Sequence, residues 1–395
     1  MQLNFNELQY IVGSPETVNA MKNVRVLRPF DDEVIAFLND LSALLRKNRE
    51  YSDIATFGFW CRKAALMKEK EKYDDIVERF GKGIVFHSTP SNVPVNFAFS
   101  FASGLLAGNA NIVRLPGKPF EQVNIISNAV NELLADKHRN MAPYIVFVKF
   151  PPVKEITDTF SALCNVRVIW GGDMTVAELR QSKIPARTTE ITFADRHSIA
   201  VIDADAYLNA DNKDVIIQNF YNDTYFSDQN ACTSPRIIFW QGKEKEAAKA
   251  DFWDRVHKLV AGKYTLAPVQ AVGKLNAMYS VAAQKDVKLQ KSEDMFITRL
   301  DVGKIDKDLM NYKYNSGFYF EKDIESLNEI ADVCDIRCQT LTYFGVNEEN
   351  FRSFLEDARP IGIDRIVPMG KSMDFTLVWD GYDLIRQMSR KVTIM

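Results

Sequence analysis

Short apolar runs alternate with longer amphipathic segments along the first half of the chain. Between residues 30 and 45 apolar side chains recur every three or four positions, which predicts a helix with one buried face. The short runs predict strands, and the segments between them predict helices. The strands are expected at 83–87, 111–115, 144–150 and 166–170, and the helices at 95–106, 120–135, 153–162 and 174–181. Because strands that alternate with helices of this length need crossover connections, the pattern predicts an α/β protein with a mostly parallel sheet.

The alternation changes near residue 190, where two strands are expected in close succession, at 190–193 and 198–203. A helix at 214–225 and a further apolar run from residue 237 follow. A chain of 395 residues is long enough for two domains. We therefore expect a first domain at 1–189 and a second domain that begins at residue 190.

Composition and charge narrow the possible partners. Hydrophobic residues make up 46% of the chain, charged residues 26%, and the net charge is −3, so neither nucleic acid nor an anionic membrane surface is expected as a partner. No apolar run approaches the ~18 residues of a membrane span, and the N-terminus lacks the features of a secretory signal. Five sparse cysteines suit a reducing cytoplasm, and the four histidines are too far apart to suggest a metal site.

One cysteine lies where a nucleophile could work. Cys232 falls among small polar residues at 228–236, directly before the apolar run that starts at Ile237. Such a loop can present a thiol at the start of a buried strand, where its surroundings can favour the reactive thiolate. The alternative is a buried structural cysteine, which is the commoner situation for a cysteine in general.

Five segments, taken in order, resemble the aldehyde dehydrogenase superfamily, and within it the acyl-CoA reductases of the LuxC type. They are Pro90–Pro94, Leu106–Arg114, Gln229–Cys232, Tyr343–Gly345, and Asp364–Gly370 with Trp379–Asp383. The resemblance implies an aldehyde dehydrogenase-like α/β fold. In that fold a parallel-sheet domain binds a nicotinamide cofactor without a G-x-G-x-x-G fingerprint, and a second α/β domain carries the nucleophile. The expected cofactor domain is 1–189 with 355–395 returning to it, and the expected catalytic domain is 190–354.

The resemblance implies a role for each of three residues in catalysis. Cys232 attacks the thioester carbonyl and expels CoA, so that the acyl group is held on the enzyme. The amide of Asn92 stabilises the oxyanion, although Asn92 could instead only shape the turn between its flanking prolines. Glu190 corresponds to the general base of the superfamily. The residues that follow Glu190 are Ile-Thr-Phe rather than the usual two glycines, and a salt-bridged glutamate is the alternative.

The cofactor residues implied by the resemblance come from three turns. Gly171 and Gly172 follow a predicted strand and could face a pyrophosphate, or they could form an ordinary strand-to-helix turn. Arg114 and Lys118 supply positive charge and no acid that would repel a 2′-phosphate, which favours NADPH over NADH. Phe344 corresponds to a residue beside the nicotinamide ribose.

The function expected from the sequence is the NADPH-dependent reduction of an acyl-CoA, or another acyl thioester, to an aldehyde through an acyl-cysteine. Two alternatives remain open on the same fold: a non-acylating aldehyde dehydrogenase or acyl-phosphate reductase, and a non-catalytic scaffold subunit. The resemblance also implies a homo-oligomer and an acyl-protein synthetase as partner. Acyl chain length cannot be read from the sequence.

Overall fold

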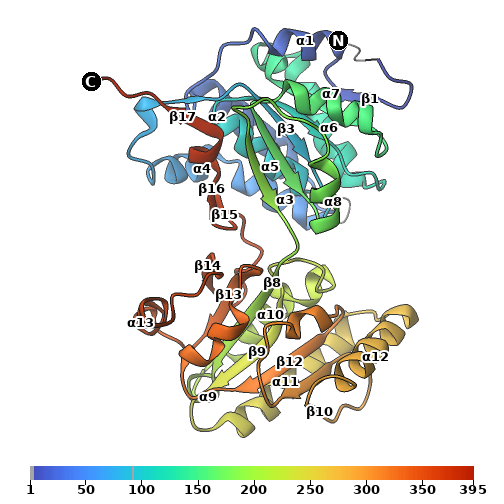
Figure 1. Ribbon diagram of the computed structural model, residues 1–395, viewed down its shortest axis with the longest axis vertical. Helices are drawn as coiled ribbons and strands as arrows, with labels where there is room; N and C mark the ends of the chain where they lie inside the picture. Colours follow the sequence, from blue (N-terminus) through green and yellow to red (C-terminus); the bar gives the residue numbers. More distant parts are fainter. Residues whose placement is uncertain (1–3, 91–92) are drawn as a thin grey trace. The chain divides into compact units, whose positions relative to one another are not determined.

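The chain forms two compact units in a computed structural model that describes residues 4–90 and 93–395. The first unit comprises residues 1–194 and 375–395, and the second comprises residues 195–374 (Figure 1). Each unit is an α/β structure built on its own largely parallel sheet, as the alternation of strands and helices predicts. In the part of the chain that the structure describes, no helix is long and apolar enough to cross a membrane.

The first unit contains a six-stranded sheet in the order β1-β5-β4-β3-β6-β7. Its strands are β1 (Gln9–Val12), β3 (Ile84–Ser88), β4 (Ala110–Arg114), β5 (Ile145–Lys149), β6 (Val166–Trp170) and β7 (Thr189–Phe193). All pairs are parallel except that of the edge strand β1 with β5. The chain builds the sheet outward from β3 in both directions, so the strand order reverses at β3. In sheets of this kind ligands bind beyond the carboxyl ends of the strands at such a reversal.

Helices of the first unit follow the predicted pattern closely. They include α2 (Asp32–Leu45), α5 (Asn96–Leu106), α6 (Glu121–Ala135), α7 (Lys154–Leu163) and α8 (Asp173–Leu179). Helix α5 is rich in small side chains because it lies directly against β4. A Cβ atom at Gly104 would stand 1.9 Å from Oδ1 of Asn111, so this approach requires glycine.

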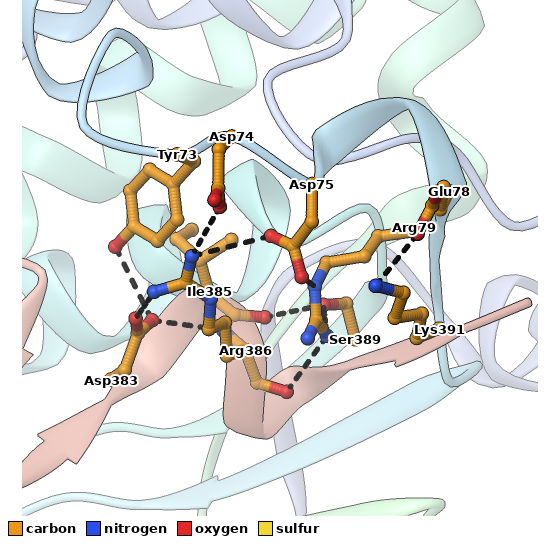
Figure 2. Close-up of polar contacts among 10 residues, drawn as sticks. All are labelled: Tyr73, Asp74, Asp75, Glu78, Arg79, Asp383, Ile385, Arg386, Ser389 and Lys391. Atoms are coloured by element: carbon orange, nitrogen blue, oxygen red, sulfur yellow. Dashed lines mark hydrogen bonds and ion pairs between the residues drawn. The ribbon is translucent and has the colours of Figure 1, made fainter.

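The C-terminal segment belongs to the first unit. Strand β17 (Ser389–Lys391) pairs antiparallel with β2 (Arg79–Gly81), and α14 (Leu384–Met388) packs its apolar side chains into the first core. Figure 2 shows the ion pairs that surround this contact. Arg386 pairs with Asp74 at 2.9 Å and with Asp383 at 3.1 Å, and Lys391 pairs with Glu78 at 2.7 Å. Because exposed pairs each contribute only about 0–1 kcal/mol, the apolar burial of α14 is the main anchor.

The second unit contains a seven-stranded sheet in the order β10-β11-β12-β9-β8-β13-β14. Its strands are β8 (His197–Asp203), β9 (Pro235–Gln241), β10 (Val287–Leu289), β11 (Thr298–Val302), β12 (Phe318–Asp323), β13 (Cys338–Phe344) and β14 (Arg365–Pro368). Only β10 runs antiparallel to its neighbour. Its helices include α10 (Lys213–Asp223), α11 (Lys245–Lys263), α12 (Pro268–Ala282) and α13 (Glu348–Ala358). Two apolar cores lie on the two faces of this sheet.

The boundaries between the units differ from the expected ones. Residues 190–193 stay with the first unit because β7 is the edge strand of the first sheet. Residues 355–374 stay with the second unit because β14 pairs with β13. The chain therefore leaves the first unit after residue 194 and returns to it at residue 375, rather than at 189 and 355.

Candidate active site

Cys232 lies in the turn that precedes β9, at the amino end of the parallel strands of the second sheet. Its side chain is partly exposed, whereas the other four cysteines are buried. The loop that carries it begins with two residues in the left-handed region, Asp228 (φ 54°) and Gln229 (φ 56°). Non-glycine residues adopt this conformation only where surrounding contacts hold them there, so the loop is a defined structure.

The side chains of Asp228 and Gln229 supply those contacts. The Asp228 carboxylate accepts hydrogen bonds from Nε2 of Gln270 at 2.7 Å and from Oγ of Ser316 at 2.9 Å. The buried Gln229 amide accepts from the Gly317 N–H at 2.9 Å and donates to the Pro235 carbonyl at 2.9 Å. Together these bonds tie the start of the cysteine loop, residues 228–236, to α12, to the start of β9 and to the residues directly before β12.

Arg236 places a buried positive charge four residues after the thiol. Its guanidinium donates to the Tyr314 carbonyl and to Oδ1 of Asn315, both at 2.7 Å, and also to the Gln229 carbonyl. Burial lowers the pKa of Arg236 to about 10, so the group stays charged at neutral pH. The Cys232 carbonyl accepts a hydrogen bond from Oγ of Ser198 at 2.7 Å, which fixes the cysteine backbone to the start of β8.

The segment Asp364–Gly370, one of those that carried the resemblance, lies in the same unit. The buried Asp223 carboxylate accepts from the Gly370 N–H at 2.6 Å and from the Ser372 N–H at 3.0 Å. Burial raises the pKa of Asp223 to about 6. One residue further on, Sδ of Met373 accepts a hydrogen bond from Oγ1 of Thr233 at 3.2 Å. The turn after β14 is therefore held by the Asp223 carboxylate at the end of α10, and it packs against Thr233, the residue that follows Cys232.

Two of the cofactor turns meet at one edge of the first sheet. Arg114 ends β4 and the pair Gly171–Gly172 follows β6, so both lie at the carboxyl ends of the strands that flank β3. The Arg114 guanidinium lies over the Phe150 ring at 4.6 Å and donates to the Phe150 carbonyl at 3.3 Å. Burial lowers the pKa of Arg114. Lys118 is exposed in the turn after β4.

The glycine pair offers less to a phosphate than its sequence suggests. The Gly171 N–H donates to the Phe193 carbonyl of β7 at 3.1 Å, so the sheet uses this donor. Gly172 is the N-cap residue of α8, which is only seven residues long. The close packing of Gly171 is the structural reason for a glycine there, because a Cβ atom would stand 2.9 Å from the side chain of Thr175.

Glu190 forms ion pairs at the opposite edge of the first sheet. It lies near the amino end of β7, in register with Arg167, whose Nε donates to Oε2 at 2.8 Å. Nε of Arg180 donates to Oε1 at 2.7 Å. Burial opposes ionisation, but the two arginines outweigh it and lower the pKa of Glu190. In this placement both carboxylate oxygens are engaged and the proton affinity is reduced, which favours the alternative of a salt-bridged glutamate over a general base.

Phe344 also lies away from the thiol. It ends β13 in register with Ile202 near the end of β8, whereas Cys232 precedes the start of β9. Because these strands are parallel, Phe344 and Cys232 lie at opposite edges of the second sheet, and contact of Phe344 with the cofactor stays a prediction. Asn92 lies outside the described residues.

The segment at residues 313–317 was missed by the sequence reasoning. It follows a short 3-10 turn and precedes β12, and it supplies several of the partners of the cysteine loop. No motif or apolar period marks it in the sequence. Its importance appears only when β12 pairs with β9 and brings it beside the loop.

The sequence matches one family along nearly its whole length. The family described as acyl-CoA reductase (LuxC) matches residues 16–391. The chain belongs to this family. A LuxC relative, the long-chain acyl-protein thioester reductase of Vibrio harveyi, is 22% identical over 336 residues. That match covers 80% of this chain and 64% of the relative, so the chain spans less than two thirds of the relative's length.

Solved structures show the fold of this LuxC chain. Aldehyde dehydrogenase 21 of Physcomitrella patens, in complex with succinate, has a TM-score of 0.65 at 12% identity and covers 95% of this chain and 88% of its own. The indole-3-acetaldehyde dehydrogenase AldA of P. syringae, in complex with NAD+ and IAA, has a TM-score of 0.66 at 11% identity, with 95% and 86% covered. The predicted aldehyde dehydrogenase-like fold is confirmed.

In this LuxC chain the predicted site residues separate into two groups. Cys232 stands with Arg236, Ser198 and the segment at 313–317 in the second unit. Arg114 and the turn at Gly171 stand together in the first. Among the described residues, no group of three His, Cys, Asp or Glu side chains is arranged to hold a metal ion. The arrangement in the second unit offers a partly exposed thiol with a buried cation near it.

Proposed function

We propose that this LuxC-family protein reduces an acyl thioester to the aldehyde through an acyl group held on Cys232. The observation that carries the proposal is the cysteine loop. A partly exposed thiol stands in a loop with fixed backbone, close in sequence and space to the buried cation Arg236. Positive charge near a cysteine favours the thiolate, which is the nucleophilic form. A purely structural cysteine would not need this exposure, and the four cysteines with no proposed role are all buried.

The proposed reaction has two steps at one sulfur atom. The Cys232 thiolate attacks the carbonyl carbon of the substrate, the C–S bond to the substrate thiolate breaks, and a new thioester forms on Cys232. Hydride then adds to that carbonyl carbon, the bond to Sγ breaks, and the aldehyde leaves while Cys232 returns to the thiolate. Asn92 is the proposed donor to the oxyanion of both steps. Glu190 has no part in this scheme because its carboxylate is held by two arginines.

A nicotinamide dinucleotide supplies the hydride when it is bound, since no side chain can donate one. The first sheet suits such a ligand, because Arg114 stands at the carboxyl edge beside the reversal of strand order. Among the described residues the Arg114 side chain donates one hydrogen bond, so it has further N–H groups to offer a phosphate. Lys118 adds charge in the next turn, and NADPH is therefore the cofactor that we propose, with Arg114 and Lys118 toward the 2′-phosphate.

The nature of the acyl donor rests on the family. The family description names acyl-CoA, and the Vibrio harveyi relative is described as acting on an acyl-protein thioester. Both donors are thioesters and both would acylate the same sulfur. We propose an acyl-CoA as the donor that the isolated protein accepts. A synthetase partner and a homo-oligomer are further proposals that rest on the family resemblance.

The test is to measure release of the donor thiol and formation of aldehyde, with and without NADPH, across acyl-CoAs of increasing length and one acylated carrier protein. A reductase that works through acyl transfer releases a single equivalent of CoA without NADPH and forms aldehyde when NADPH is added. If every thioester is inert while an aldehyde and NADP+ give the acid, the protein is a non-acylating dehydrogenase and the proposal fails.

A further inference from the structure

Residues 314–317 of the second unit are hydrogen-bonded to the cysteine loop at several positions. Asp228 accepts from Oγ of Ser316 at 2.9 Å, and Oδ1 of Asn230 accepts from the side chain of Asn315. At the far end of the loop Arg236 donates to the Tyr314 carbonyl at 2.7 Å. Residues 314–316 therefore contact the loop on both sides of the thiol, at Asp228 and Asn230 before it and at Arg236 after it.

Lys313 directly precedes the residues that contact the cysteine loop. Its Nζ donates to the Arg196 carbonyl at 3.2 Å, directly before β8. The Cys232 carbonyl is held by Ser198, two residues further along the same stretch, at 2.7 Å. The lysine side chain and the cysteine backbone are thus both fixed to one short segment of chain, residues 196–198. This common anchor, together with the electrostatic interaction between Lys313 and Cys232, places the ammonium group in the surroundings of the thiol.

The charges around the two groups are few and can be named. The charged groups that interact electrostatically with Lys313 are Asp195, Arg236, Arg337 and Cys232. Those that interact with Arg236 are Tyr319, Cys232 and Asp228. Burial lowers the pKa of Lys313, and a charged Cys232 raises the pKa of both Lys313 and Arg236. Coulomb interaction is mutual, so each cation that is favoured by a thiolate must also favour the thiolate.

We propose that Lys313, together with Arg236, is a positioning residue that stabilises the thiolate of Cys232. The inference deepens the proposed function and rests on it for its biological meaning. When the thiol ionises, its proton passes to water and the negative charge on Sγ is balanced by the Lys313 ammonium and the Arg236 guanidinium. When the acyl group is transferred to Sγ that negative charge leaves with the substrate thiolate. It reappears on Sγ when the aldehyde is released.

The experiment measures the rate at which iodoacetamide alkylates Cys232 across a pH series, by mass spectrometry of the peptide that contains it. The assay needs no substrate and no cofactor. The four buried cysteines of the same chain serve as an internal record of folding. The variant is Lys313→Gln, which removes the charge and keeps an N–H donor for the Arg196 carbonyl. Lys313→Arg keeps the charge and should rescue the profile.

Lys322→Gln is the matched control. Like Lys313, Lys322 donates to a backbone carbonyl, that of Gly303 at 2.9 Å. It stands near the end of β12, in register with Phe239, and so lies at the other end of the strands from the cysteine loop. A general effect of losing one lysine from this unit would appear in both variants.

We expect the midpoint of the alkylation profile to move up by about one pH unit in Lys313→Gln, so that labelling below the midpoint slows about tenfold. Lys313→Arg and Lys322→Gln should keep the profile of the unaltered protein. An unchanged midpoint in folded Lys313→Gln, or an equal shift in Lys322→Gln, overturns the inference. If the buried cysteines of Lys313→Gln become labelled, that variant has not folded and Lys313→Arg decides the question. A shifted alkylation profile in Lys313→Arg then overturns the inference, and an unchanged profile supports it. A shifted profile in a protein that reduces no thioester leaves the inference standing and refutes the proposed function alone.

Discussion

The side chain of Gln229 pairs with the backbone of Phe318 as a neighbouring strand would. Its Oε1 accepts from the Phe318 N–H at 3.2 Å and its Nε2 donates to the Phe318 carbonyl, also at 3.2 Å. Gln229 is buried and in the left-handed region. One side chain therefore both closes the sheet at the start of β12 and holds the conformation of the cysteine loop.

Gln229→Ala should lower the stability of the second unit and loosen the loop. The substitution leaves buried backbone groups of Gly317 and Phe318 without their partner, at a cost of about 2–4 kcal/mol. Urea denaturation should show this loss in the free energy of unfolding. The control is Gln284→Ala, which removes an exposed amide of the same unit that accepts one side-chain hydrogen bond. A loss no larger than that of the control would show that Gln229 does not determine the loop.

The stability of the first unit should depend on pH through His87. Its buried ring is hydrogen-bonded to Oγ of Ser100 through Nδ1 (2.7 Å) and to Oδ1 of Asn111 through Nε2 (2.9 Å). Burial lowers the pKa of His87 from 6.5 to about 4. The unfolded chain therefore binds the proton first as the pH falls, and the folded state loses stability between about pH 6.5 and pH 4.

That loss should amount to about 3 kcal/mol at most. The free energy of unfolding at a series of pH values measures it. His87→Gln, which keeps a neutral side chain with a donor and an acceptor, should show a smaller slope over the same range. An equal slope in both proteins would mean that His87 is not the group responsible.

Glu190→Gln should leave the chemistry nearly intact. If Glu190 is only the partner of Arg167 and Arg180, acyl transfer and NADPH oxidation should change by no more than about threefold. A general base would cost a factor of about 10²–10⁴. Because the Arg167 side chain is only 3% exposed, loss of the charge should instead lower the stability of the first unit by about 1–3 kcal/mol. Glu132→Gln on the exposed face of α6 is the control and should change neither quantity.

Arg114→Ala should weaken the preference for NADPH. An arginine that pairs with the 2′-phosphate contributes to binding of NADPH and not of NADH. The ratio of kcat/KM for the two cofactors should therefore fall by about tenfold or more, mainly through KM. Lys118→Ala should have the same direction and a smaller effect, because Lys118 is exposed. Equal losses with both cofactors would place Arg114 elsewhere than at the 2′-phosphate.

The strands of the first sheet could be predicted because parallel strands covered on both faces are near-continuous apolar runs. The runs at Ile84–Ser88 and Val166–Trp170 are recognisable for this reason. Cys232 is recognisable because its polar loop is followed directly by another apolar run. The residues at which elements end, and the order in which strands pair, are less evident from the sequence. The return to the first unit was expected twenty residues too early (375 − 355 = 20), because β14 is a short edge strand.

The roles of individual side chains depend on contacts between distant parts of the chain. Arg167 lies within an apolar run, 23 residues before Glu190, and their ion pair follows from the register of β6 and β7. Lys313 lies 81 residues after Cys232 (313 − 232 = 81), and the residues that follow Lys313 reach the cysteine loop because β12 pairs with β9. Neither neighbour can be inferred from spacing, which is why the sequence suggested a base at Glu190 and gave no sign of Lys313.

The central claim is that Cys232 carries the acyl group. The most direct measurement is the intact mass of the protein after it is mixed with an acyl-CoA in the absence of nucleotide. We predict one acyl adduct, located on the peptide that contains Cys232, absent from Cys232→Ala, and lost as aldehyde when NADPH is added. An adduct that persists in Cys232→Ala, or aldehyde formed by that variant, would contradict the claim.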